Sequence, residues 1–189
     1  MKNTATVEEA IASLKAGGVG VLPTDTVYGV VARAADREAV KRLYGLKRRE
    51  GKPGTVVAAN AQQLKDLGVD ERYLKQVEQY WPGAVSVETP YHSDDNDLDQ
   101  GTGHCAWRVV ADEGLRRVLE QTGPLQTSSA NHAGEPSATG VEMARAYFGD
   151  EVDFYVDGGD LSGRLPSTVI RVDGERIEVK RQGAVKLAS

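Results

Sequence analysis

The chain has 189 residues, 40% hydrophobic and 27% charged, which is ordinary for a soluble globular protein of one domain. Its one cysteine, Cys105, excludes an internal disulfide, and no apolar run reaches the roughly 18 residues of a membrane span. The first residues lack the apolar region of a secretory signal, so we expect a cytoplasmic protein with no membrane partner. The net charge of −5 excludes a surface coated with nucleic-acid-binding charge but not a local basic patch.

Helix and strand signals interleave irregularly along the chain. Thr6 predicts the cap of a first helix that Gly17 and Gly18 end, and Asp36 predicts the cap of a second. Further helices are expected after Asn60 and at about 71–80 and 112–121. Strands are expected at VGVLP, TVVAA, AVSVE, CAWRVV, GPLQT, VDFYVDGG, STVIRV and RIEVK, with an Asp173-Gly174 hairpin signal between the last two. This order indicates an α/β fold with a mixed parallel and antiparallel sheet.

Residues 89–103 form a long acidic segment. Asp95, Asp97 and Asp99 alternate as in a calcium loop, but the glycine falls one place late and Ala106 takes the twelfth position. We therefore expect an acidic surface loop or lid.

The segment LPTDTVYGV, residues 22–30, places hydroxyls and Asp25 just beyond the end of a strand. Ligands of open α/β sheets bind at such positions. A polar turn, with Gly29 supplying backbone freedom, explains the segment equally well.

Eight basic residues lie between positions 33 and 52, an asymmetry in an acidic chain. Lys47 extends the buried stripe of its helix, so we expect it to emerge at the edge of the core beside a cleft. With Arg49 and Lys52 it could hold a triphosphate; a solvated helix end is the alternative. No P-loop or dinucleotide-binding glycine motif occurs in the sequence.

Two later segments carry further polar side chains. LQTSSANHAGEPS, residues 125–137, runs from a strand into three hydroxyls and an amide, either a binding surface or a capped turn. Strand alternation predicts that Ser128 points away from Thr127 and Ser129. Ser167 precedes one late strand and Arg181 ends the next. The three histidines are too scattered for a zinc site, and Cys105 is expected in the core.

Taken in order, these segments resemble the YrdC family of threonylcarbamoyl-AMP synthases, from about Gly17 to Ala184. The motifs that carry the resemblance are PTDTVYGV, the Lys-x-Arg of LKRRE, KPGTVVAAN, WPGAVS, CAWRVV, TSSANHAGEPS, DGG with STVIRV, and KRQGA. The resemblance implies a single YrdC-like domain over residues 1–189. It also implies a twisted open sheet with flanking helices and a central, positively lined concave cleft.

The resemblance implies a nucleotidyltransferase. Such an enzyme joins L-threonine, bicarbonate or CO2, and ATP with Mg2+ into threonylcarbamoyl-AMP and pyrophosphate. The product feeds threonylcarbamoyladenosine modification of tRNA, so tRNA and the threonylcarbamoyl-transferase machinery are further possible partners.

The resemblance also assigns roles to individual residues. Lys47 and Arg49 are the implied catalytic residues, and no protein ligand of the metal is implied. The implied L-threonine ligands are Thr24, Arg108, Thr127, Ser129 and Ser167. The implied ATP ligands are Lys47, Arg49, Lys52, His104, Ser129, Asn131, Ser137 and Arg181. The segment PGTVV departs from the family pattern, which leaves one contact on the threonine side in question.

Two alternatives to a synthase stay open. One is a nucleotide- or RNA-binding paralogue on the same fold without synthase activity. The synthase is favoured over this paralogue by the presence of a complete set of residues, Lys47, Arg49, Ser129 and Asn131. The other is a carbamoyl-transferring maturation module, although those modules usually lie within much longer chains.

Overall fold

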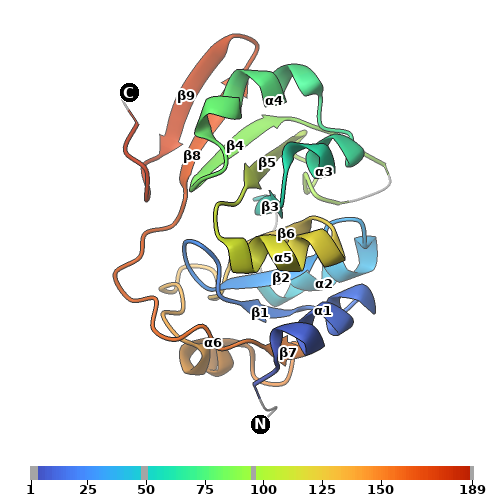
Figure 1. The fold of residues 1–189 in the computed structure, drawn as a ribbon, viewed down its shortest axis with the longest axis vertical. Coiled ribbons are helices and arrows are strands. Elements are labelled where there is room, and N and C mark those ends of the chain that lie inside the picture. The colour runs from blue at the N-terminus through green and yellow to red at the C-terminus, as the bar shows by residue number, and fades with distance from the viewer. Residues whose placement is uncertain (1–3, 48–50, 95–96, 188–189) are drawn as a thin grey trace.

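The computed structural model describes residues 4–47, 51–94 and 97–187. These residues form a nine-stranded sheet in the order β7-β1-β2-β6-β3-β5-β4-β8-β9, which runs through the whole molecule (Figure 1). The strands are β1 Gly20–Leu22, β2 Gly29–Arg33, β3 Thr55–Ala58, β4 Val85–Pro90, β5 His104–Val109, β6 Leu125–Ser129, β7 Phe154–Tyr155, β8 Thr168–Asp173 and β9 Arg176–Arg181. The helices are α1 Val7–Lys15, α2 Arg37–Lys47, α3 Ala61–Asp66, α4 Glu71–Val77, α5 Glu113–Thr122 and α6 Val141–Phe148, with a 3-10 turn at Glu78–Tyr80.

The sheet is mixed, as predicted. β3 pairs with β5, β4 with β8 and β1 with β7 in parallel, whereas the remaining five pairings are antiparallel. The last of these is the predicted hairpin, in which Asp173 lies opposite Arg176. The prediction of a mixed open sheet with flanking helices is therefore confirmed.

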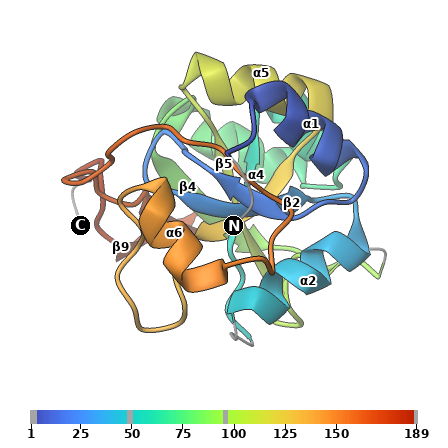
Figure 2. The same ribbon diagram turned by 90° about the horizontal axis from the view of Figure 1, so that it is seen from below.

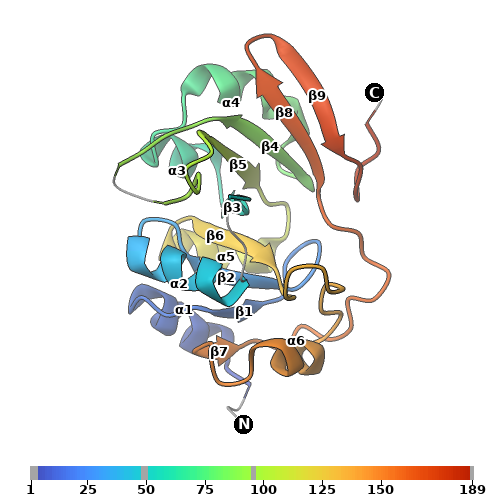
Figure 3. The ribbon, with the colours of Figure 1, turned by 180° about the vertical axis from the view of Figure 1, so that it is seen from behind.

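Helices cover both faces of the half of the sheet that holds β1 and β2. Figure 2 shows α1 and α5 on one side of these strands and α2 and α6 on the other. Successive residues of a strand point to opposite faces of the sheet. Val31 and Val57 pack on the face covered by α1 and α5, and Val30 and Val56 pack on the face covered by α2. At the other end of the sheet, Tyr73 and Val77 of α4 pack on β4 and β8 (Figure 3).

The chain begins and ends its early helices as the sequence predicts. Thr6 and Glu9 form a reciprocal capping box at α1, and the side chain of Asn60 accepts a hydrogen bond from the backbone N–H of Gln63 at α3. Two elements were not predicted, β2 and α6. Strand β2 follows directly on the polar segment 22–28, and α6 begins after Gly140 without a side-chain cap, so the usual start signal is absent.

The described part of the acidic loop packs against the fold. Leu98 is fully buried, and the carboxylate of Asp99 accepts a hydrogen bond from Gly103 N–H. Asp97 reaches α2, where its oxygens lie 3.1 Å from Arg37 and 3.9 Å from Lys41. Basic residues of α2 therefore neutralise part of the acidic charge of this loop. Asp95 lies outside the described residues. In the described ranges, no helix combines the length and hydropathy needed to cross a membrane.

Candidate active site

One row of residues crosses five neighbouring strands and faces a cavity of about 670 Å³. The register pairs each member with the next, in the order Arg171, Glu88, Ala106, Thr55 and Thr127. Because cross-strand partners share a face of the sheet, all five lie on the same face, and all five line the cavity. On β4 and β8 this is the face opposite α4, whose side chains pack against Val87 and Ile170. The cavity thus occupies the side of these strands that α4 leaves uncovered.

Residues of the segment 23–29 form one wall of this cavity, and the chain after β7 supports that segment from behind. The hydroxyl of Tyr28 donates to the carbonyl of Gly159 and accepts from Gly158 N–H, both at 2.8 Å. Gly158 is required there because a Cβ would lie 2.4 Å from the Cβ of Pro23. The fully buried Tyr28 therefore fixes the 23–29 loop against the chain that follows β7.

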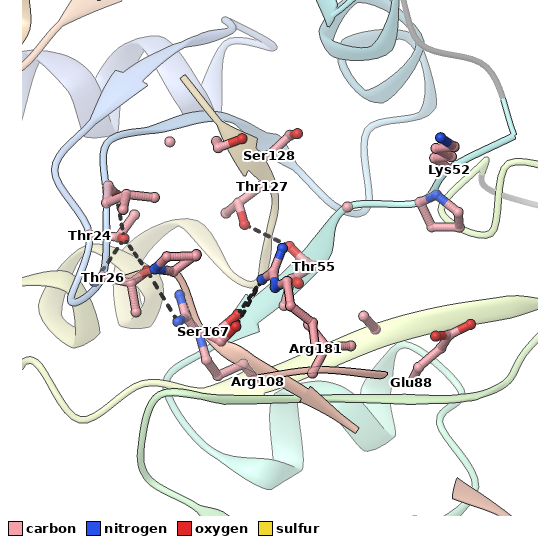
Figure 4. Close-up of a pocket in the computed structure, with 18 of the residues that line it drawn as sticks. Thr24, Thr26, Lys52, Thr55, Glu88, Arg108, Thr127, Ser128, Ser167 and Arg181 are labelled. Carbon is pink, nitrogen blue, oxygen red and sulfur yellow. Dashed lines mark hydrogen bonds between the residues drawn. The ribbon is translucent and has the colours of Figure 1, made fainter. Parts of the chain in front are cut away.

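Arg108 places a buried cation in this wall. It is 3% exposed, its Nη1 donates to Thr26 Oγ1 at 3.3 Å, and its Nη2 lies 3.0 Å from Oδ1 of Asp25. Its Nε has no hydrogen-bond partner among the described residues. Burial lowers the pKa of Arg108 and raises that of Asp25, while each charge opposes the shift of the other. The guanidinium is thus held in a fixed direction with a donor still to be satisfied (Figure 4).

A chain of hydroxyls runs beneath the cavity. Ser86, fully buried on β4, lies 3.2 Å from Thr55 Oγ1 and donates to Ser167 Oγ at 2.9 Å. Arg181 donates to the carbonyl of Ser167 at 2.8 Å, and Thr127 Oγ1 donates to the carbonyl of Thr55 at 2.8 Å (Figure 4). Side chains from β3, β4, β6 and β9 therefore hold one another in place around the cavity.

The structure brings most of the predicted site residues together. The implied threonine ligands all line the cavity: Thr24, Arg108, Thr127, Ser129 and Ser167. So do the implied ATP ligands Lys52, His104, Ser129, Ser137 and Arg181. Arg49 lies outside the described residues. Ser128 also borders the cavity, contrary to the simple alternation expected along the strand.

Lys47 and Asn131 have a different position. Lys47 is only 2% exposed, although it was expected to emerge beside a cleft. Its ammonium donates to the carbonyls of Ser129 and Asn131 and, at 3.1 Å, to Oδ1 of Asn131. Neither residue is among the described residues that line the cavity, so their contact with a nucleotide remains a prediction.

Sequence reasoning missed four lining or supporting residues, Thr55, Ser86, Glu88 and Arg171. Each sits in a segment predicted as a strand, and the polar residues of AVSVE and TVVAA stand out within apolar runs. Period-two alternation could have placed Ser86 and Glu88 on one face. The register that brings them beside Thr55 and Arg171 cannot be read from those patterns.

Cationic groups dominate the cavity. Its described lining holds Lys52, Arg108, Arg171 and Arg181, against Glu88 as the one carboxylate, which pairs with Arg171. Such a lining favours an anionic ligand with hydrogen-bonding groups. Cys105 is fully buried, and burial raises the pKa of its thiol well above the ordinary value, so it is a core residue and not a nucleophile. No cluster of metal-binding side chains occurs within 4–47, 51–94 and 97–187.

The sequence profile of the Sua5/YciO/YrdC family, described as telomere recombination, matches residues 12–183. This chain belongs to that family. It is 32% identical over 186 residues to a putative threonylcarbamoyl-AMP synthase of Mycobacterium leprae, covering 96% of this chain and 84% of the relative. It is also 32% identical over 169 residues to the threonylcarbamoyl-AMP synthase of Stutzerimonas stutzeri, covering 87% of this chain and 91% of the relative.

Solved structures of this family share the fold. P. abyssi Sua5, whose crystal structure was determined in complex with L-threonine, superposes with a TM-score of 0.83 at 28% identity. That match covers 94% of this chain and 54% of the longer Sua5 chain. E. coli YciO superposes with a TM-score of 0.81 at 22% identity over 95% of this chain and 90% of its own, a likeness of fold. The predicted YrdC-like architecture is therefore confirmed.

Proposed function

We propose that this protein of the Sua5/YciO/YrdC family is a threonylcarbamoyl-AMP synthase that uses L-threonine, bicarbonate or CO2, and ATP. One observation carries the proposal: Arg108, a buried cation whose Nε has no hydrogen-bond partner among the described residues, lines a cavity that also holds several hydroxyl groups. An amino acid with a carboxylate and a hydroxyl matches that lining, because the carboxylate takes a charge-assisted hydrogen bond from Arg108. The likeness to P. abyssi Sua5 with L-threonine supports the same substrate.

The reaction needs charge neutralisation more than a nucleophile from the protein. Carboxylation of the threonine amine gives a carbamate and releases a proton if CO2 reacts, or water if bicarbonate reacts. A carbamate oxygen then bonds to the α-phosphorus of ATP while the bond to the β-phosphate oxygen breaks, and pyrophosphate leaves. Both reactants are anions, so the cavity must hold them together against their repulsion. Lys52 and Arg181 line the cavity and could contribute the required positive charge, with Arg49 as a further candidate.

Mg2+ and the biological partners belong to the same proposal. Glu88 is the one carboxylate in the described lining and is already paired, so the metal would be held mainly by phosphate oxygens. Bound there, it would neutralise phosphate charge. We further propose that the protein acts in the cytoplasm and that its product is used by tRNA threonylcarbamoyl-transferase machinery.

The decisive assay is pyrophosphate release by the purified full chain. With ATP, Mg2+, bicarbonate and L-threonine, release should depend on threonine, and threonylcarbamoyl-AMP should be detectable by mass spectrometry. ATP without threonine and the non-hydrolysable α,β-methylene analogue of ATP serve as controls. A folded sample that binds ATP but releases no pyrophosphate with threonine would reject the synthase and favour a binding paralogue.

Substitution of Ser86 with alanine should raise the KM for threonine by about three- to tenfold, with a smaller effect on the KM for ATP. The Ser86 hydroxyl bridges Thr55 and Ser167 by hydrogen bonds, each of which contributes about 0.5–1.5 kcal/mol. Without this bridge, the side chains of Thr55 and Ser167 are less well oriented. Thr122→Val is the control, because it removes a buried hydroxyl that donates within α5. Equal KM values for threonine in the wild-type protein and in Ser86→Ala would contradict the proposed role of the hydroxyl chain.

A further inference from the structure

Lys47, the last residue of α2, connects that helix to the turn that follows β6. Its ammonium donates to three oxygens, the carbonyls of Ser129 and Asn131 and the side-chain Oδ1 of Asn131. An ammonium has three protons, so these acceptors can use its full donor capacity. The residue is 2% exposed. These contacts form a cross-link between a helix and a turn.

Asn131 is also fully occupied inside the turn. Its Oδ1 accepts from Ser129 Oγ at 2.6 Å and from Lys47 at 3.1 Å. Its Nδ2 donates to the carbonyls of His132 at 2.9 Å and Glu135 at 2.7 Å. A side-chain amide has two N–H donors and two acceptor lone pairs, so these four contacts satisfy it. No hydrogen-bonding group of this side chain remains for a nucleotide.

The backbone of the same segment is tied to the rest of the fold. Ala130 N–H donates to the carbonyl of Tyr28 at 2.8 Å, and Ala138 N–H donates to the carbonyl of Ala130 at 2.9 Å. Of the residues in the segment 129–138, Ser129 and Ser137 line the cavity. The network of Lys47 and Asn131 therefore bonds directly to Ser129 and, through the carbonyl of Glu135, to the stretch of chain that leads to Ser137.

We propose that Lys47 and Asn131 are positioning residues, which hold the 129–138 turn so that Ser129 and Ser137 face the nucleotide. They act through this turn and not by contacting the phosphates of ATP. The effect on the nucleotide rests on the proposed synthase function, whereas the effect on the turn does not. The two parts can therefore be tested separately.

The first test measures amide hydrogen exchange in the ligand-free full chain. In Lys47→Met, the amides of residues 129–138 should exchange at least tenfold faster than in the wild-type protein, while those of α5 stay unchanged. A buried, hydrogen-bonded cross-link protects the segment that it holds, so its loss opens that segment locally. Unchanged exchange in 129–138 would overturn the proposal.

Three further variants make this test specific. Asn131→Ala keeps the lysine and both of its carbonyl acceptors, and it should also accelerate exchange in 129–138, even if Lys47→Met fails to fold. Lys41→Met changes an exposed lysine of the same helix that pairs with Glu38, and it should leave the turn unchanged. Lys52→Met changes a cavity-lining lysine, so it should weaken ATP binding without altering ligand-free exchange.

The second test compares ATP with adenosine by calorimetry. Displacement of Ser129 and Ser137 should weaken both ligands by a similar factor in Lys47→Met. If only ATP binding weakens and adenosine binding is kept, Lys47 contacts the phosphates directly and the proposal fails. If the wild-type protein releases no pyrophosphate, the synthase function fails, but the exchange result still decides the structural role of Lys47.

Discussion

Replacement of Arg108 with methionine is expected to weaken threonine binding by about ten- to a hundredfold and to destabilise the protein by about 3–5 kcal/mol. The first effect is the loss of a charge-assisted hydrogen bond of about 1.5–3 kcal/mol to the substrate carboxylate. The second arises because Asp25, with a 10% exposed side chain, loses its cationic neighbour 3.0 Å away. Threonine-dependent pyrophosphate release and denaturant unfolding measure the two effects.

A double variant separates the two roles of Arg108. Arg108→Met with Asp25→Asn removes the buried carboxylate as well as its partner, so most of the lost stability should return. Threonine binding should stay weak, because the cation that would hold the carboxylate is still missing. If threonine affinity returned together with stability, Arg108 would be a structural residue and not a substrate ligand.

The stability of the single variant should also depend on pH. Burial raises the pKa of Asp25 above its ordinary value of 3.8, so ionisation of this group opposes folding as the pH rises through the folded pKa. Arg108 opposes that shift in the wild-type protein. Without it, the stability deficit of Arg108→Met relative to wild type should grow between about pH 4 and pH 7. A deficit that shrinks over this range would contradict the assigned ion pair.

Replacement of Gly54 with alanine should lower the melting temperature by about 6–12 °C and reduce turnover by about a hundredfold. A Cβ at Gly54 would lie 2.0 Å from the carbonyl oxygen of Thr127, so β3 and β6 would have to move apart. Such overpacking costs about 3 kcal/mol, which corresponds to this temperature shift for a domain of this size. Thr55 and Thr127 would move with their strands, and a displacement near 1 Å costs about a hundredfold in rate.

Gly45→Ala is the matched control for this substitution. Gly45 is an exposed position within α2, and a Cβ there meets no atom within 4 Å. Alanine favours the helix over glycine by about 0.5–1 kcal/mol, so the melting temperature should rise by about 1–4 °C with activity unchanged. Scanning calorimetry checks both variants; a Gly54→Ala protein as stable as wild type would disprove the close approach of β3 and β6.

The segment PGTVV, which contains Gly54, departs from the family pattern. From the sequence alone, that departure left one contact on the threonine side in question. In the structure this segment brings Thr55 into the cavity, next to Ser86 and Thr127. A hydroxyl on β3 therefore occupies that part of the lining.

The sequence by itself determined much of the local structure, and its resemblance to a known family identified nine of the residues that line the cavity. Caps such as Thr6 and Asn60 act within a few residues of the chain, so their signals survive without tertiary information. The ordered motifs also pointed correctly to the family, and to Arg108, Thr127 and Ser167 as cavity residues. By contrast, β2 and α6 were missed because their local start signals are weak.

Only the tertiary structure decided which side chains face each other. Register across β8, β4, β5, β3 and β6 aligns Arg171 and Glu88 with Thr55, and no local pattern encodes that alignment. The same holds for Lys47: helical spacing placed it at the margin of the core, but the carbonyls that surround its ammonium come from residues more than 80 positions away. The sequence states the charge and the chemical type of each side chain. Which groups that side chain contacts depends on the long-range packing of strands and turns.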